Sequence, residues 1–280
     1  DVCSSDLGGV IGSSWAIQYA MRGLSVALYD INDEQLLKSR GQMEKSLDAL
    51  VGHDAIAQTQ KAEIVARVHP TTSMEEAVSD AQFIQESGPE RLEIKRSILA
   101  QVEQYAASDA LYASSTSGLL ISEIVAEAAH PERCVGAHPY NPPHLIPLVE
   151  ITRGEKSSDE VVKTVYDFYQ SIGKEAVLLR KECPGFIANR LQLALYREVQ
   201  DLVMRGVCSV EDVDKALVYG PGIRWAIFGH NMIMQMGNPG GLTGMVKMLG
   251  NSGDVWLADM ASWTHQPDNW SEVAQPGVDE

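Results

Sequence analysis

The most constraining feature of this sequence is a glycine-rich turn that leads directly into a helix and is followed by a short strand. The turn reads Gly8-Gly9-Val10-Ile11-Gly12, the helical pattern continues to Arg22, and an apolar run from Ser25 ends on Asp30. Two glycines match the end of G-x-G-x-x-G, which brings a pyrophosphate close to the backbone and a helix close to a strand. Glycines of an ordinary turn explain the loop but not the acid that follows. The pattern therefore predicts a dinucleotide-binding unit.

The acid predicts which dinucleotide binds. Asp30 ends the second strand, where a carboxylate accepts hydrogen bonds from the adenosine ribose hydroxyls. The next residues, Ile31 and Asn32, supply no cation for a 2′-phosphate. The helix start offers its N–H groups to the phosphates. We therefore expect NAD rather than NADP, and the residues expected to bind it are Gly9, Ile11, Gly12 and Asp30.

Strand and helix patterns alternate from the glycine turn to Pro184, which indicates a mostly parallel sheet wrapped by helices. Beyond Pro184 the pattern is helical, with expected helices over 186–205 and 210–217 and no strong strand signal. We predict an α/β fold, with a Rossmann-type domain over 1–184 and an all-α domain over 185–280. Further expected strands are 67–69, 81–86, 111–114, 134–137, 148–152 and 175–179, and expected helices are 33–68 with a break near 52–53, 73–78, 90–107, 121–129 and 159–172.

The residues before the turn do not fit the strand that this fold requires there. Leu7 stands where the first glycine of the motif belongs, and DVCSSD carries two aspartates and two serines. The heptapeptide DVCSSDL is also what the end of a common sequencing adapter encodes. We interpret residues 1–7 as a non-native segment that replaces the first strand and weakens NAD binding; a genuine, divergent N-terminus is the alternative.

Composition excludes several classes of function. The net charge is -16, and the 38 acidic residues are not offset by any cluster among the 22 basic ones, which argues against nucleic-acid binding. No apolar run is long enough to span a membrane, and the first residues lack the pattern of a secretory signal. The four cysteines show no CxxC spacing or His/Cys grouping. We therefore expect a cytoplasmic enzyme with reduced cysteines and no metal.

Four further segments carry a family resemblance: SSTSG from Ser114, AHPYNP around His138, PLVE ending at Glu150, and PGFIANR around Asn189. At these segments the sequence resembles the 3-hydroxyacyl-CoA dehydrogenase superfamily, over nearly the whole chain from Gly8. The intervals from Ser117 to His138 and from His138 to Glu150 match the family's spacing. Within it, HPYNPPHLIPLVEI and GPGIRWA are more similar to the L-gulonate 3-dehydrogenase (lambda-crystallin) and carnitine 3-dehydrogenase branch.

The chemistry of these residues fits oxidation of a secondary alcohol. His138 suits the base that takes the hydroxyl proton, because histidine titrates nearest neutral pH. Glu150 would hold the other imidazole nitrogen and stabilise the imidazolium. Ser117 and Asn189 would hydrogen-bond the substrate oxygen as it becomes a carbonyl. Each residue alone has an ordinary structural explanation, and only their joint spacing favours a site.

The resemblance implies further roles. It places Glu90 and Lys95 near the nicotinamide half of the cofactor, with a solvated helix pair as the alternative. It also implies a homodimer formed through the α domain. The methionines Met232, Met234, Met236, Met245 and Met248 could serve the core of that domain or the interface, and we assign them to the core. Arg224, in the loop GPGIRW, is expected to face the cleft and bind a substrate carboxylate with Trp225 beside it; a structural ion pair is the alternative.

The leading function is NAD-dependent oxidation of the 3-hydroxyl of a small hydroxy acid, L-gulonate- or carnitine-like. A 3-hydroxyacyl-CoA dehydrogenase is the enzymatic alternative, disfavoured because Lys38, Lys45 and Lys61 form no obvious cluster for CoA phosphates. A non-catalytic dinucleotide-binding protein is the second alternative. A metal site at His138 and His144 is disfavoured, because no third ligand is positioned.

Overall fold

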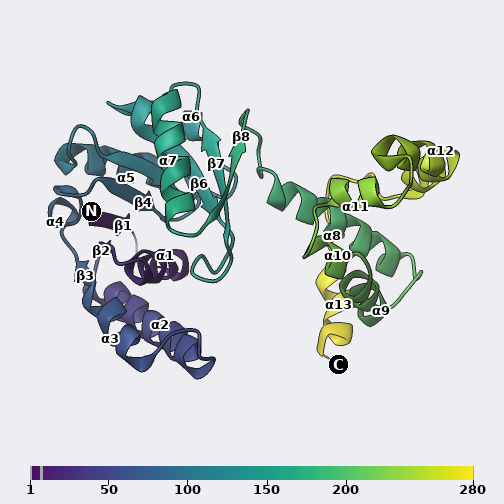
Figure 1. Ribbon diagram of the computed structural model, residues 1–280, viewed down its shortest axis with the longest axis horizontal. Coiled ribbons are helices and arrows are strands. Elements are labelled where there is room, and N and C mark those ends of the chain that lie inside the picture. Colours follow the sequence, from purple (N-terminus) through teal and green to yellow (C-terminus); the bar gives the residue numbers. More distant parts are fainter. Residues whose placement is uncertain (1, 7–8, 280) are drawn as a thin grey trace. The chain divides into compact units, whose positions relative to one another are not determined.

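The computed structural model describes residues 2–6 and 9–279, which form two compact units divided between Ile187 and Ala188 (Figure 1). The first unit is a Rossmann-type sheet covered by helices, and the second is helical. The split follows from the sequence, because every strand precedes Pro184.

The first unit is built on an eight-stranded sheet in the order β3-β2-β1-β4-β5-β6-β7-β8. Its strands are parallel except where β7 runs antiparallel to β6. Because parallel strands end at the same edge of a sheet, the residues that follow them gather there. The strands are β1 (Val2–Asp6), β2 (Ser25–Tyr29), β3 (Val68–Thr71), β4 (Phe83–Glu86), β5 (Leu111–Ser114), β6 (Cys134–Pro139), β7 (Leu148–Arg153) and β8 (Glu175–Leu179).

Helices cover both faces of this sheet and enclose two apolar cores. Trp15, Tyr19 and Tyr169 lie in the core beneath α1 and α7, whereas Ile98 and Ile121 belong to the core beneath α4, α5 and α6. The helices are α1 (Val10–Met21), α2 (Asp33–Gly52), α3 (Gln58–Ala66), α4 (Met74–Val78), α5 (Leu92–Tyr105), α6 (Ile121–Ile124), the 3₁₀ turn η1 (Pro131–Arg133) and α7 (Asp159–Ser171).

The largest differences from the sequence-based expectation in this unit lie at three points, and other bounds shift by one or two residues. The backbone of Val2–Asp6 forms a central strand, paired with β2 and β4, despite its polar composition; Leu7 and Gly8 lie outside the described residues. Strand β6 continues through His138 to Pro139 rather than ending at Ala137. Helix α6 ends at Ile124 and is followed by turns, so the expected helix over 121–129 is too long.

The second unit is helical throughout its regular elements, within the residues described. Arg224 lies in the short helix α10 (Ile223–Trp225), directly after the helical turn η2 (Val218–Gly222), so the expected loop is wrong. None of the five methionines assigned to the core is buried, because α11 and α12 leave them at the surface of the single chain. The other helices are α8 (Ala188–Met204), α9 (Val210–Leu217), α11 (His230–Met236), α12 (Gly241–Asp259) and α13 (Trp270–Asp279). None of the helices described is both long and apolar enough to cross a bilayer.

Candidate active site

Two antiparallel strands bring the predicted base and its carboxylate together. His138 on β6 is the register partner of Glu150 on β7, so their side chains emerge on the same face of the sheet. The Nδ1 atom of His138 lies 2.9 Å from Oε2 of Glu150. The other carboxylate oxygen accepts the backbone N–H of Ile187 at 2.8 Å. Glu150 is fully buried and His138 is 7% exposed, which leaves the imidazole able to meet a substrate at its edge.

This hydrogen bond determines which imidazole nitrogen is available for chemistry. A carboxylate accepts, so Nδ1 of His138 carries the proton and donates it to Glu150. The Nε2 atom is then the nitrogen with a lone pair, suited to accept a hydroxyl proton. The Phe186 ring packs against the imidazole with centroids 5.5 Å apart, and Tyr140 lies 6.1 Å away. Burial, followed by the Glu150 carboxylate, raises the pKa of the Tyr140 phenol, which therefore stays protonated near neutral pH.

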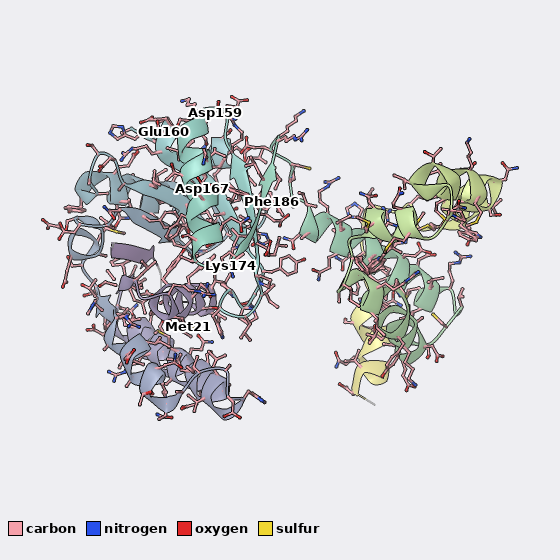
Figure 2. The ribbon with its side chains drawn as sticks, in the orientation of Figure 1. Met21, Asp159, Glu160, Asp167, Lys174 and Phe186 are labelled. Atoms are coloured by element: carbon pink, nitrogen blue, oxygen red, sulfur yellow. The ribbon has the colours of Figure 1, made fainter. Side chains whose placement is uncertain are left out.

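Phe186 reaches this position through an unusual backbone. Its φ of 51° lies in the left-handed region, directly after Gly185 with φ 73°. The resulting turn buries the ring against His138, and Figure 2 shows the labelled Phe186 beyond the end of β8. This contact was not predicted from the sequence, although the Pro184-Gly185 pair signals a tight turn there.

Ser117 lies in a loop held by a single carboxylate. The loop follows β5, and Oε1 of Glu90 accepts the backbone N–H groups of Ser117, Gly118 and Leu119 at 2.8, 3.0 and 3.3 Å. The Thr116 hydroxyl donates to the same oxygen at 2.7 Å. Glu90 therefore shapes the loop that presents Ser117, and this capping role was not expected from the sequence.

Lys95 lies under this loop, not in solvent. Its ammonium is 2.8 Å from Glu86, a fully buried carboxylate at the end of β4, and also donates to the carbonyl of Gly88 at 3.2 Å. Glu90 is its second anionic neighbour, at 3.7 Å. Lys95 is 1% exposed, so the alternative of a solvated helix charge is wrong, and its contact with a cofactor stays a prediction.

The residues expected to hold NAD fit a dinucleotide. Gly9 is the N-cap of α1, and a Cβ atom added there would meet open space. The helix has no side-chain cap and no acid in its first turn, so its positive end favours a phosphate. Ile11 and Gly12 form that turn. Asp30 directly follows β2, and its carboxylate already accepts the N–H of Ile31 at 2.7 Å.

The remaining predicted residues belong to the second unit. Asn189 is the second residue of α8 and is half-buried, whereas Arg224 is exposed on α10. Trp225 is 39% exposed, and its indole N–H donates to Nδ1 of His230 at 3.1 Å. Among the described residues, no group of His, Cys, Asp or Glu is arranged to hold a metal ion.

Comparison with known proteins identifies the family. Residues 8–183 match the NAD binding domain of 3-hydroxyacyl-CoA dehydrogenase, and residues 185–260 match its C-terminal domain. An L-carnitine dehydrogenase of Pseudomonas aeruginosa is 40% identical over 92% of this chain and 78% of its own. A 3-hydroxyacyl-CoA dehydrogenase of Gibberella moniliformis is 38% identical over 97% of this chain and 83% of its own.

A solved structure agrees with this assignment. The crystal structure of FHMPC 5-dehydrogenase, an NAD⁺-dependent dismutase, superposes with a TM-score of 0.86 at 29% identity, covering 99% of this chain and 86% of that one. The family models span both units, and the His138–Glu150 pair lies within the first. The chain therefore belongs to the 3-hydroxyacyl-CoA dehydrogenase family and is an NAD-dependent oxidoreductase.

Proposed function

We propose that this enzyme oxidises the 3-hydroxyl of a free 3-hydroxy acid of the L-carnitine class, with NAD as the hydride acceptor. The observation that carries the proposal is the buried His138–Glu150 pair at 2.9 Å. It fixes one imidazole nitrogen and leaves the other for a substrate hydroxyl.

The residues of the chain divide the work of proton transfer. Nε2 of His138 takes the hydroxyl proton, and Glu150 stabilises the imidazolium that forms. Ser117 and Asn189 hydrogen-bond the substrate oxygen while it becomes a carbonyl. Bound NAD, held by the start of α1 and by Asp30, supplies the acceptor for the hydride that leaves the substrate carbon.

The substrate class is supported by the relatives and by the chemistry of the second unit. Several relatives near 40% identity are L-carnitine dehydrogenases. L-Carnitine carries a carboxylate and a quaternary ammonium group. The Arg224 guanidinium matches a carboxylate through two parallel hydrogen bonds. Exposed aromatic rings nearby in the sequence, those of Tyr219, Trp225 and Phe228, are of the kind that attracts a quaternary ammonium.

The relative from Gibberella moniliformis is a 3-hydroxyacyl-CoA dehydrogenase, so a CoA thioester is the second candidate substrate. Two of the three lysines considered for CoA phosphates already pair with surface acids: Lys38 with Glu34 at 2.8 Å and Lys61 with Asp48 at 2.5 Å. These pairs reduce the positive charge available to a phosphate. They favour the free acid.

A substrate panel separates the two candidates. L-Carnitine, L-gulonate, 3-hydroxybutyrate and 3-hydroxybutyryl-CoA are each incubated with the protein and NAD, and NADH is followed by its absorbance. We expect turnover of L-carnitine and none of the thioester. Turnover of the thioester alone would move the function to the CoA branch, and NAD binding without turnover of any of the four would favour a non-catalytic dinucleotide-binding protein.

We also infer that the enzyme is a cytoplasmic homodimer assembled through its helical unit. The described cysteines Cys134, Cys183 and Cys208 are free thiols, which suits a reducing compartment. Large apolar side chains on α11 and α12 are exposed in the single chain, and a second copy would cover them.

A further inference from the structure

The segment that joins the two catalytic strands is anchored to the dinucleotide-binding helix. Residues 140–147 connect β6, which carries His138, to β7, which carries Glu150. The two ends of the segment are tied by a hydrogen bond from the N–H of Tyr140 to the carbonyl of Leu148 at 3.3 Å. Any displacement of this segment would therefore shift the His138 imidazole, the Glu150 carboxylate or both.

The anchor is a two-point contact between His144 and Ser14. The backbone N–H of His144 donates to the Ser14 hydroxyl at 3.0 Å, and Nδ1 of the same residue lies 2.6 Å from that oxygen. The Ser14 hydroxyl can donate to a bare Nδ1 or accept from a protonated one, so this second contact is a hydrogen bond in either tautomer of the imidazole. Ser14 is 3% exposed and lies in the second turn of α1, whose first turn is expected to face the cofactor phosphates.

A buried ammonium holds the same segment through two backbone carbonyls. Nζ of Lys174, which precedes β8, is 2.5 Å from the carbonyl of Pro143 and 2.6 Å from that of Ile146. It also lies 5.2 Å from the centroid of the Trp15 ring on α1. Figure 2 shows the labelled Lys174 at the far end of α7. Adjacent residues of α1, Ser14 and Trp15, therefore contact the segment and the lysine that holds it.

We propose that Ser14 and His144 are positioning residues that fix the 140–147 segment, and through it His138, to the helix that binds NAD. Neither touches the reacting atoms. The pair sets the position of the base relative to the cofactor. Binding of NAD at the start of α1 therefore restricts the motion of residues 140–147. The inference rests on the proposed function for its kinetic effect but not for the effect of NAD on hydrogen exchange in the segment.

A merely structural role predicts a different outcome. A buried hydroxyl that only stabilises the fold would lower the melting temperature when removed and leave the chemistry unchanged. A positioning pair would lower kcat with little change in NAD affinity. Its two members would act as one unit, because removing either breaks the same contact.

The kinetic test compares Ser14→Ala, His144→Ala, their double mutant and His144→Asn with the full-length parent, using L-carnitine and NAD. Asparagine retains an acceptor near the place of Nδ1. We expect each alanine variant to lose about tenfold in kcat through misplacement of the base. The double mutant should lose no more than either single one, and His144→Asn should recover most of the rate. Ser39→Ala, which removes a buried serine hydroxyl bonded to its own helix α2 at 2.9 Å, is the matched control.

Hydrogen exchange tests the same inference without turnover. We expect NAD to slow amide exchange across residues 140–147 in the parent and in Ser39→Ala, and to lose this effect in Ser14→Ala and His144→Ala. Equal protection by NAD in all variants, or additive losses of kcat, would overturn the inference. Failure of the proposed function would instead appear as absent L-carnitine turnover with the exchange pattern intact.

Discussion

Residues 1–187 enclose two apolar cores, whereas residues 188–280 leave most of their large apolar side chains exposed. Both core clusters lie entirely in the first unit. In the second, the buried residues of the described chain are Gln200, Val213, Ala261 and Ala274. Val255, Trp256 and Leu257 on α12 are 67%, 61% and 69% exposed. The first unit buries enough apolar side chains to form its own cores. The second exposes apolar side chains of the kind that a protein partner buries.

This contrast separates two kinds of function. Proton transfer is proposed for the sheet unit, where strand register positions His138 and Glu150. Substrate anchoring and assembly are proposed for the helical unit, where Arg224 and the apolar surface are exposed. Variants in each unit should therefore fail in different ways.

The largest effect is expected in the sheet unit. His138→Ala removes the base, and kcat should fall on the order of a hundredfold or more. NAD affinity, measured by fluorescence titration, should stay within about twofold because the variant leaves the residues expected to hold NAD, at the start of α1 and at Asp30, unchanged. A parent-like kcat would remove His138 from the site.

The next largest effect is expected in the helical unit, where Arg224 is proposed to bind the substrate carboxylate. Arg224→Met should raise KM for L-carnitine by about one to two orders of magnitude, because it removes the charge-assisted hydrogen bonds proposed between the guanidinium and the substrate carboxylate. Steady-state kinetics should show a smaller change in kcat, and the melting temperature should barely move because Arg224 is exposed. An unchanged KM would favour the alternative of a surface ion pair.

Assembly provides the third test. Trp256→Glu places a charge in the exposed apolar surface of α12, so it should shift the homodimer towards monomer in analytical ultracentrifugation. The matched control is Leu37→Glu on α2, since Leu37 is also 69% exposed but lies in the unit with its own cores. Dissociation by both variants, or by neither, would contradict the proposed division between the units.

The smallest effect concerns stability in acid. Burial first, and the Lys174 ammonium second, lower the pKa of His144. The unfolded chain then binds a proton that the folded protein resists, so the stabilising contribution is present above about pH 6.5 and is lost as pH falls below it. Melting curves of His144→Asn should therefore decline less than those of the parent on acidification. The exposed His53→Asn is the control, and parallel curves for parent and His144→Asn would contradict the assignment.

Local signals in the sequence account for much of the fold. The strands over 111–114 and 175–179 and the helix over 210–217 have the predicted bounds, because turn and cap residues flank each apolar pattern. Strand β6 was predicted too short, since a proline normally ends such a run. Pro139 is tolerated there because it is the last residue of the strand.

The site was harder to predict where its contacts are remote in the chain. His138 and Glu150 are separated by one hairpin, so their spacing carries a signal. Ser14 and His144 are 130 residues apart, and no periodicity links them. The expected burial of the methionines on α11 and α12 was also wrong, because an apolar pattern does not say whether its own chain or a second copy covers it.

The pH dependence of kcat/KM for L-carnitine, in the parent and in Glu150→Gln, tests the central claim most directly. If Glu150 stabilises the protonated form of the base, a neutral amide at 150 should lower turnover and move the acidic limb of the profile to lower pH, since the imidazolium loses its counter-charge. Superimposable profiles with equal turnover would contradict the account of the His138–Glu150 pair as the proton-accepting unit.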